Sequence, residues 1–595
     1  MGSPATERPA NDTAAPGGPG GVGWPRVLAG ATTVLLAAAA WVNTHRLNTD
    51  GIAYLRLAGY YVDGPVRLAI SGYWGPLLSW LLAPALAAGL EPLAAARVVM
   101  ALTGLVFAGG CAVLLRVLGL RRQVVLAGSG LAGLAAVGWS VEFISPDLLV
   151  AGLMALALAA TVRPRWAAGG GGAFLAGVVW GLAYLAKAVA LPFAVVAVPL
   201  TAWWLRARRP DSAARWGRAL ALTAMGWLLT AGPWVGLLSA KYGRLTFSTA
   251  AKAAHAVVGP PDQERYHPFA RRLHHPEPGR LTSWEDPTSL PYADWSPFAS
   301  REYFLHQVRV SWRNLGTAAW LLGRLDLLHL GVLALAGLAA AGWVRRRQTR
   351  RHDADSRGKT AAAASPRHGE RVAKGLPAGE KEPQAAPAMP GLAIGLVCLW
   401  TVCLVAVYLP GYLERVDLRY FYAAWPWLFA ATALAAERLG VALAPRSPLL
   451  ARMAWPLALI SFAAPPVIQG TLALRGLPQP AAILARELAE GIRRTGRPGP
   501  LAGSGLLGGD RAGLFAAFFL GQPWYGDQPG ARPADWAAVG ARWVVLSARR
   551  PEVRELAADP RFRERTWQVL TGIESPERWL RVFENNEPRP AGRGP

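Results

Sequence analysis

The chain has 595 residues, of which 53% are hydrophobic and 17% are charged, and its formal net charge at pH 7 is +25. A soluble protein of this length would divide into several domains with polar surfaces, whereas here the apolar residues come in blocks of about 17–25, the length that crosses a bilayer. Composition therefore excludes an ordinary soluble enzyme and predicts a polytopic membrane protein. The abundance of Ala, Gly and Arg over Lys is typical of a bacterial protein from a high-GC genome.

The positive charge does not predict nucleic-acid binding. The arginines cluster between apolar blocks, where cytoplasmic loop charges fix the orientation of a membrane protein. No zinc pattern, RNA-binding stretch or base-reading basic helix accompanies them. We therefore expect membrane lipids, and no nucleic acid, as partners.

The N-terminal part of the chain contains a tail, a first span and a lone acid. Residues 1–25 are rich in Pro, Gly and Ala and predict a disordered tail. The apolar block 27–43 lacks a small-residue cleavage site before Asp50, so we expect an uncleaved span and no removed signal peptide. The segment "NTDGIAYLRLAGYYVDG" (48–64) follows, with Asp50 in its first turn and a stripe of aromatic and aliphatic residues behind it.

The remaining apolar blocks predict a multi-span topology. Further spans are expected near 97–117, 123–140, 147–162, 172–187, 190–205, 218–239, 326–344, 391–409, 419–437 and 450–470. Arg-rich stretches lie between them at 116–123, 163–166, 206–218, 345–359 and 437–446.

These stretches can all face the cytoplasm only if one apolar block does not cross. That block is 73–90, in which Pro76 and Pro84 disfavour an uninterrupted span. We expect it to be a re-entrant or juxtamembrane helix on the outer face, which leaves about 11 transmembrane helices. In the alternative topology, 73–90 crosses and 116–123 lies outside.

This topology divides the chain into three parts: a tail at 1–25, a transmembrane domain at 26–470 and an extracytoplasmic α/β domain at 471–595. The transmembrane domain includes an extracytoplasmic loop at 241–325, whose Trp and Pro content suggests an ordered flap. It also includes a disordered cytoplasmic insert at 345–390.

The C-terminal domain is indicated by strand-like stretches at 543–550 and 577–585. It contains "GSGLLG" (503–508), which matches a dinucleotide-binding glycine pattern. No convincing strand precedes this pattern and no acid ends a strand about 20 residues later, so turn glycines are the default interpretation.

Polar groups at membrane depth are functional candidates because they are costly to keep there. In this chain they gather on the predicted outer side. They are Asp50, Glu142, Asp147, Lys187, Arg419 and Tyr420. Structural alternatives stay open for them: the two aspartates suit helix N-caps, Lys187 suits a snorkelling side chain and Arg419 suits a lipid-phosphate anchor.

Together these residues resemble a known family. The motifs are Asp50 after a short first span, Pro76-Leu77-Leu78-Ser79-Trp80, Arg97 opening a span, Pro146-Asp147, Gly181-Leu182 through Lys187, and Arg419-Tyr420 opening a late span. The set resembles the GT-C fold glycosyltransferases that use polyprenyl-phosphate sugars, a group that includes aminoarabinose transferases, protein O-mannosyltransferases and RgtA/B/C/D-like enzymes. Gly51 departs from the pattern, since many members carry a second acid there.

The resemblance implies a membrane enzyme that transfers a hexosyl or pentosyl group. The donor would be a polyprenyl-phosphate sugar, the acceptor an extracytoplasmic glycan, lipid or protein, and the displacement inverting. It implies that Asp50 is the base and that Lys187 and Arg419 bind the phosphate. Asp147 and Glu142 become candidates for acceptor or metal binding, and a divalent cation is a possible cofactor that the sequence does not decide.

Further residues are candidates for lining the substrate groove: Tyr54, Tyr73, Trp74, Trp80, Arg97, His255 and Tyr420. The aromatic ones equally suit interfacial anchors. The histidines of the 241–325 loop match no zinc-ligand spacing. The alternative function is a membrane transporter or flippase of lipid-linked sugar. Such a protein would carry ionisable residues near mid-membrane and related halves, whereas here the charges sit at one face and no repeat is visible.

Overall fold

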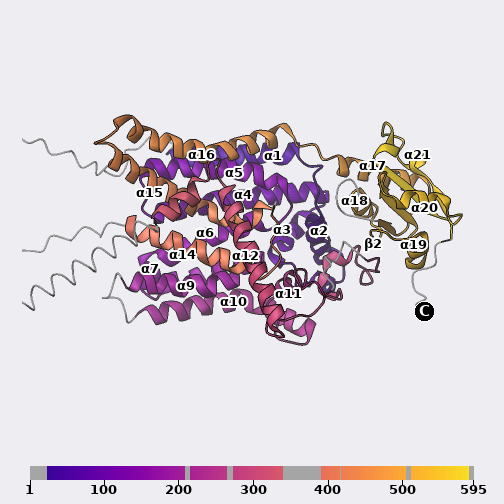
Figure 1. The fold of residues 1–595 in the computed structure, drawn as a ribbon, viewed down its shortest axis with the longest axis horizontal. Helices are drawn as coiled ribbons and strands as arrows, with labels where there is room; N and C mark the ends of the chain where they lie inside the picture. The colour runs from indigo at the N-terminus through magenta and orange to yellow at the C-terminus, as the bar shows by residue number, and fades with distance from the viewer. Residues whose placement is uncertain are drawn as a thin grey trace, which may run out of the picture.

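The computed structural model describes residues 23–207, 215–263, 272–338, 390–415, 417–503 and 511–587. It is a mostly helical bundle with a small mixed sheet at its C-terminal end (Figure 1). The predicted tail at 1–25 falls almost entirely outside the described residues, and so does the predicted insert at 345–390. Both stay predictions.

Ten helices form the long bundle within the described ranges. They are α1 (Trp24–Val42), α4 (Pro92–Val117), α5 (Arg122–Glu142), α6 (Asp147–Val162), α8 (Gly171–Ala186), α9 (Ala190–Arg206), α10 (Trp216–Tyr242), α14 (Pro390–Tyr408), α15 (Trp425–Leu443) and α16 (Pro448–Arg475). Each overlaps a span expected from the sequence. Several are long and apolar enough to cross a membrane, namely α1, α4, α5, α10 and the segment containing α16. The number of crossings stays a prediction.

Small residues allow the bundle helices to approach closely. A Cβ atom on Gly177 of α8 would lie 2.0 Å from the carbonyl oxygen of Thr223 on α10, and one on Gly110 of α4 would lie 2.5 Å from the carbonyl oxygen of Gly152 on α6. In a bilayer, where the hydrophobic effect between helices is weak, such close backbone contacts supply much of the association energy. The glycines therefore hold together the helices that carry the polar candidates.

Two short helices lie at the end of the bundle that faces the C-terminal domain (Figure 1). They are α2 (Thr49–Val62) and α3 (Pro76–Ala87), which pack on each other, and the Ser79 hydroxyl donates to the Tyr54 carbonyl at 3.1 Å. With 12 residues, α3 is about 18 Å long, less than the roughly 30 Å of hydrocarbon. Its length agrees with the expectation that block 73–90 does not cross.

The loop expected at 241–325 contains more helix than the sequence suggested. It holds three short elements, α11 (Ala250–Ala256), η3 (Ser283–Glu285) and η4 (Pro287–Ser289), and one long helix, the 23-residue α12 (Arg301–Gly323). In α12 the apolar stripe is interrupted by Arg and Gln residues, which hides its helical period. The expectation that this loop forms a flap stays a prediction.

The span expected at 326–344 begins at a break between helices. After α12 the chain turns, and helix resumes over 330–338. Asp326 is buried at this turn, where it accepts the backbone N–H of Leu330 and the hydroxyl of Ser461, both at 2.7 Å. The Asp326 carboxylate therefore caps the helix over 330–338. Residues 339–344 of the expected span lie outside the described ranges.

The C-terminal domain is a five-stranded mixed sheet in the order β2-β1-β3-β5-β4. The first three strands are parallel, with β1 in the middle, and β5 pairs antiparallel with β3 and β4. The strands are β1 (Leu501–Gly503), β2 (Trp524–Asp527), β3 (Trp543–Ser547), β4 (Phe562–Glu564) and β5 (Leu580–Asn585). The helices are α17 (Pro480–Arg494), α18 (Arg511–Leu520), α19 (Pro533–Val539), α20 (Glu552–Ala558) and α21 (Thr566–Val569). The predicted small α/β domain is confirmed as a mixed sheet with helices.

The context of the glycine pattern at 503–508 differs from the one inferred from sequence. A strand does precede it, since β1 ends at Gly503, and an acid does end the next strand, since β2 ends at Asp527. The three-residue β1 is too short to be recognised from alternation. Residues 504–510 lie outside the described ranges, so the pattern itself stays uninterpreted.

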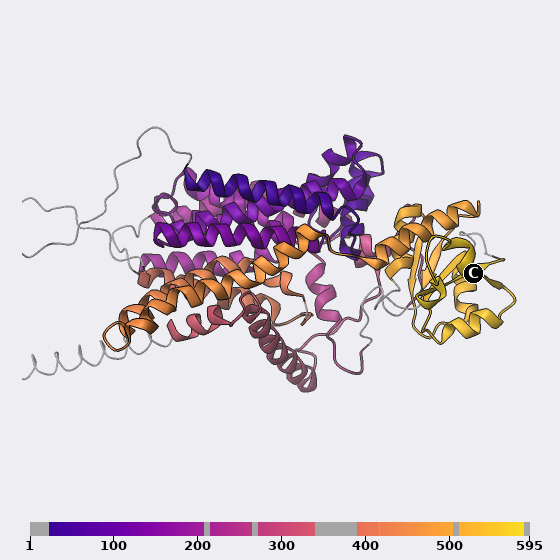
Figure 2. The same cartoon turned by 90° about the horizontal axis from the view of Figure 1, so that it is seen from above.

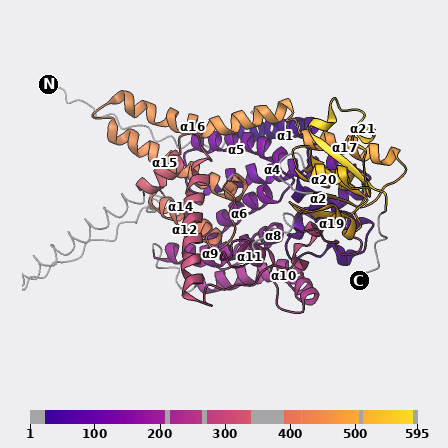
Figure 3. The same cartoon turned by 45° about the vertical axis from the view of Figure 1, so that its right-hand side comes forward.

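The outer loop ties the sheet to the bundle. The backbone N–H of Trp524 donates to the Leu281 carbonyl at 2.7 Å, and that of His274 donates to the Tyr525 carbonyl at 2.8 Å. These bonds cover β2, an edge strand that would otherwise expose unpaired backbone groups. Figures 2 and 3 show the C-terminal domain at the same end of the bundle as α2.

Candidate active site

Four separate elements bring charged residues together at the α2 end of the bundle. Arg419 lies in η5 (Leu418–Ala424), just before α15. Its Nη1 is 2.7 Å from Oδ2 of Asp50, which lies in the first turn of α2, and its Nε is 2.7 Å from Oδ2 of Asp417. The same Nε is 3.9 Å from Oδ2 of Asp147, the first residue of α6.

Lys187 completes this group from the C-terminal end of α8. Its Nζ is 2.5 Å from Oδ1 of Asp147 and 4.9 Å from the ring centroid of Tyr420. We name the five residues Asp50, Asp147, Lys187, Asp417 and Arg419 the Arg419 cluster. It contains three carboxylates and two cations in continuous contact.

Access differs within the Arg419 cluster. The Asp147 side chain is 3% exposed, whereas those of Asp50, Arg419 and Lys187 are 17%, 14% and 27% exposed. Asp147 is therefore the most deeply buried of these four residues. Asp50, Arg419 and Lys187 remain accessible to a ligand. A carboxylate at the start of a helix also interacts favourably with the helix dipole, which helps to hold Asp147 in place.

An aromatic wall stands beside Asp50. The indole Nε1 of Trp284, from η3 of the outer loop, donates to Oδ1 of Asp50 at 3.2 Å. The Nε1 of Trp74 donates to the Trp284 carbonyl at 2.7 Å, and the two rings meet edge-on at 5.3 Å. Tyr73 and Tyr54 pack on Trp74 at centroid distances of 4.7 and 5.1 Å. Three of the predicted groove residues thus form one surface with Trp284.

Sequence reasoning missed two members of this site. Trp284 lies in a loop about 230 residues after Asp50, and nothing local signals their contact. Asp417 lies two residues before Arg419 in "ERVDLRY". An acid so close in sequence to a candidate arginine is able to pair with it, as Asp417 does, so this spacing could have identified Asp417 as a site residue. Burial raises the pKa of Asp417 to about 6, against the opposing effect of Arg419. Its Oδ1 is buried without a hydrogen-bond partner among the described residues.

Glu142 and Tyr420 lie at the border of the Arg419 cluster. The Tyr422 hydroxyl donates to Oε2 of Glu142 at 3.3 Å, and the Tyr422 ring stacks on Trp139 at 3.9 Å. Tyr420 lies beside both cations, with its ring centroid 5.9 Å from the guanidinium carbon of Arg419. Tyr420 is therefore placed to contact whatever the cations bind.

Three predicted groove residues make their contacts elsewhere. Arg97 is buried, and its guanidinium donates to backbone carbonyls of Arg46 and Val141 at 2.9 and 3.1 Å. Trp80 packs on Trp234 of α10. His255 stacks on Trp295 at 4.1 Å and hydrogen-bonds Gln307, within the outer loop. None of these contacts reaches the Arg419 cluster.

A second charged cluster lies beside the first, and we name it the Glu285 cluster. It joins α2, the end of α10 and the outer loop, and its members are Arg56, Tyr60, Lys241, Arg280, Glu285 and Asp286. The Glu285 carboxylate is fully buried and accepts the Tyr60 hydroxyl at 2.6 Å and the backbone N–H of Leu281 at 2.9 Å. It fixes the loop that carries Trp284.

Over the described ranges, no group of three or more His, Cys, Asp or Glu side chains is arranged to hold a metal ion. Asp50 and Asp147 each face a cation at ion-pair distance instead. The possible divalent cation therefore stays undecided, and no step is derived through one.

Comparison with known proteins gives a likeness in structure. No protein-family model matches the sequence, and no curated protein matches it. Among solved structures, the chain is similar to ArnT from Cupriavidus metallidurans bound to undecaprenyl phosphate, with a TM-score of 0.51 and 17% identity, over 96% of this chain and 99% of that one. It also aligns with the Archaeoglobus fulgidus oligosaccharyltransferase in the apo form, with a TM-score of 0.49 and 11% identity, over 88% of this chain and 70% of that one.

The fold and the site therefore define a multi-pass membrane protein with charged residues clustered at one end of its bundle. Its fold is similar to that of ArnT, which confirms, for the fold alone, the GT-C resemblance seen in the sequence.

Proposed function

We propose that this protein is a glycosyltransferase that moves a sugar from a polyprenyl-phosphate donor to an acceptor at the outer face of the cell membrane. The observation that carries the proposal is the Arg419 cluster, in which two cations and three carboxylates from four distant elements meet. Charged residues at membrane depth are costly unless they serve a ligand or each other. The likeness to ArnT, whose structure holds undecaprenyl phosphate, supports the same donor class.

The donor phosphate would bind Lys187 and Arg419. Arg419 offers a planar fork suited to two phosphate oxygens, and Lys187 offers a point charge. Asp50 pairs with Arg419, and Asp147 pairs with Lys187. An incoming phosphate would therefore compete with Asp50 for Arg419, and a carboxylate that loses a cationic partner becomes a stronger base.

Asp50 would then act as the general base. It takes the proton of the acceptor hydroxyl as that oxygen attacks the anomeric carbon of the donor sugar. The bond between the anomeric carbon and the phosphate oxygen breaks, and the polyprenyl phosphate leaves with the electron pair, held by the two cations. Attack opposite to the leaving phosphate inverts the anomeric configuration.

The remaining candidates would orient the reactants. The indole N–H of Trp284 donates to Oδ1 of Asp50. The other oxygen, Oδ2, pairs with Arg419. Once the donor phosphate binds Arg419, Oδ2 would be available to the acceptor hydroxyl. The wall of Trp74, Tyr73 and Tyr54 offers apolar surface for a sugar ring or the first units of the lipid. Glu142, at the border, would contact the acceptor.

The orientation follows from charge. The Arg-rich stretches join bundle helices at the end opposite to Arg419, for example between α4 and α5 and between α15 and α16. Cytoplasmic loops are the ones enriched in Arg and Lys. The Arg419 cluster would therefore face the outside, where the acceptor is.

The test is a transfer assay on the purified full-length protein with labelled polyprenyl-phosphate sugars. Asp50→Asn is compared with Asp63→Asn, an exposed acid at the other end of α2. We expect Asp50→Asn to lower transfer by about 10²–10⁴-fold and Asp63→Asn to leave it unchanged. Intact transfer by Asp50→Asn would remove Asp50 from the reaction, and movement of the lipid across the bilayer without transfer would favour the flippase alternative.

A further inference from the structure

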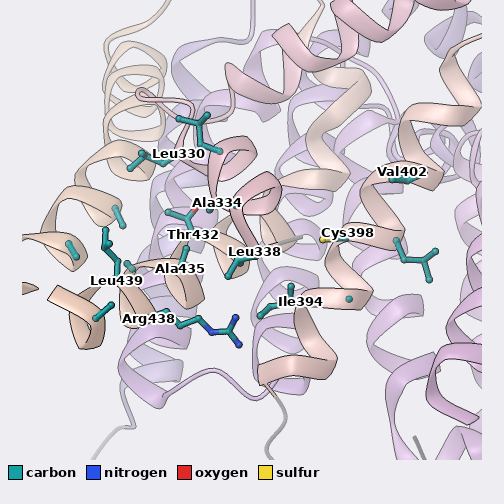
Figure 4. Close-up of a pocket in the computed structure, with 18 of the residues that line it drawn as sticks. Leu330, Ala334, Leu338, Ile394, Cys398, Val402, Thr432, Ala435, Arg438 and Leu439 are labelled. Carbon is teal, nitrogen blue, oxygen red and sulfur yellow. The ribbon is translucent and has the colours of Figure 1, made fainter. Parts of the chain in front are cut away.

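A large apolar groove lies in the half of the bundle away from the Arg419 cluster. Its volume is about 1070 Å³, and α9, residues 330–338, α14, α15 and α16 line it (Figure 4). Small residues open it: Gly337 has no other atom within 4 Å of where a Cβ would stand. Rim residues such as Trp203 and Val402 are 65% and 66% exposed, so the groove opens toward the surrounding lipid.

The groove is far from the candidate active site. Arg419 precedes the N-terminal end of α15, whereas the groove is lined by the C-terminal half of that helix, from Thr432 to Ala442. Arg438 lies 13 residues beyond Trp425, which is about 20 Å along a helix. If the Arg419 cluster faces outside, as proposed, the groove belongs to the cytoplasmic leaflet.

One cation stands at the mouth of the groove. Arg438 is the one charged residue among its described lining residues, and it forms no hydrogen bond or ion pair with another described residue. Figure 4 shows its side chain reaching from α15 toward α14. An arginine in this position is available to an anionic headgroup.

One unpartnered polar group lies deeper in the groove. The Thr432 side chain is 4% exposed, lines the groove, and its hydroxyl has no hydrogen-bond partner among the described residues. A buried hydroxyl without a partner costs free energy, so a ligand atom that pairs with it would be favourable. Thr432 lies six residues before Arg438 on α15, about 9 Å along the helix.

We propose that this groove is a binding site for an anionic diacyl phospholipid of the cytoplasmic leaflet. The phosphate pairs with Arg438, an ester carbonyl accepts the Thr432 hydroxyl, and the acyl chains lie on the apolar lining. The spacing fits, because the headgroup region of a bilayer is about 5–8 Å thick on each side and the esters lie at its inner boundary. Basic pockets between transmembrane helices on the cytoplasmic side are typical sites for anionic headgroups.

Two other occupants fit less well. An isoprenoid chain has no carbonyl for Thr432 and no charge for Arg438 unless its own phosphate lies at this end, about 20 Å or more from the proposed active site. A segment of this chain between 339 and 389 contains acids and backbone carbonyls of its own, and if it filled the groove, wild type would show no preference between the two lipids. A diacyl phospholipid has both groups in one molecule.

The experiment measures lipid retention by native mass spectrometry on the full-length protein, with phosphatidylglycerol and phosphatidylcholine as probes. Wild type is expected to retain phosphatidylglycerol about fivefold better, the preference that one surface arginine supplies. Arg438→Gln should abolish that preference, and Arg446→Gln, an exposed arginine outside the groove, should keep it.

Two further variants locate the site. Gly337→Phe places a ring in the groove from a position where a Cβ atom meets open space, and it should lower retention of both lipids. Thr432→Val should lower both, and Thr432→Ser should restore them. The proposal is overturned if wild type retains the two lipids equally, if Arg438→Gln keeps the preference, or if the lipid that Gly337→Phe displaces is a polyprenyl phosphate.

Discussion

The two charged clusters beside α2 differ in how their acids are satisfied. In the Glu285 cluster the two buried carboxylates receive backbone N–H groups and hydroxyls as well as cations. Glu285 and Asp286 face three cations, Arg56, Arg280 and Lys241. In the Arg419 cluster three carboxylates share two cations, and one oxygen of Asp417 has no partner among the described residues.

The difference separates a structural role from a functional one. A network whose buried carboxylates are all satisfied rigidifies its surroundings, and the Glu285 cluster holds the loop that presents Trp284. A network with surplus negative charge and partly exposed cations is able to exchange partners. We therefore expect changes in the Arg419 cluster to alter transfer, and changes in the Glu285 cluster to alter stability.

After Asp50→Asn, the largest effect is expected from Arg419→Gln. It removes the fork for the phosphate and leaves Asp50 and Asp417 without their cation, so transfer from a labelled donor should fall by about 10²–10³-fold, the usual cost of a lost oxyanion donor. Arg419→Lys keeps the charge but not the fork and should recover part of the loss. Full activity of Arg419→Gln would contradict its role in phosphate binding.

A smaller effect is expected from Trp284→Phe, which removes the indole N–H that donates to Asp50. Transfer should fall by about 10- to 100-fold, since a lost hydrogen bond to a charged group costs roughly 1.5–3 kcal/mol and each 1.36 kcal/mol is about tenfold in rate. The KM for the donor should change little, because Trp284 does not contact the cations. A change confined to KM would place Trp284 in donor binding instead.

A pH effect of a few-fold is expected from Asp417. With a pKa of about 6, the Asp417 carboxylate becomes neutral as the pH falls below 6. In its neutral form it no longer competes with the donor phosphate for Arg419. Asp147 and Lys187 also face Asp417, and they stay paired with each other. The KM for the donor should therefore fall about threefold as pH is lowered through 6. Asp417→Asn should show a flat KM over that range, and an unchanged profile in this variant would assign the titration to another group.

The smallest effect on transfer is expected from Glu285→Gln. Removing one partner of a buried charge network destabilises by about 3 kcal/mol, so thermal unfolding of the detergent-solubilised protein should occur at lower temperature. Transfer per folded molecule should stay within about threefold of wild type. A large loss of transfer without loss of stability would move Glu285 into the active site.

Much of the fold was predictable because membrane helices follow from apolar blocks and Arg-rich loops. The bundle helices overlap the predicted spans, and the 12-residue α3 agrees with the prediction for 73–90. The polar interruptions in α12 hid a helix, and β1 was too short to recognise. Both errors arise where local pattern is weak and tertiary packing decides.

The site was predictable only in part. Asp50, Asp147, Lys187 and Arg419 stood out because charge is rare at membrane depth. Trp284 did not, since its contact with Asp50 depends on how the Glu285 cluster folds the loop. Arg97 satisfied a motif, yet its guanidinium binds backbone carbonyls. A sequence shows which groups are unusual, but not which of them face one another.

The most direct measurement of the central claim is the affinity of the full-length protein for undecaprenyl phosphate. Lys187→Gln is compared with Lys241→Gln, because both lysines hold a buried aspartate at 2.5 Å with about a quarter of the side chain exposed. The account predicts that binding weakens at least tenfold in Lys187→Gln and stays as in wild type in Lys241→Gln. Equal affinities in wild type and Lys187→Gln would contradict it.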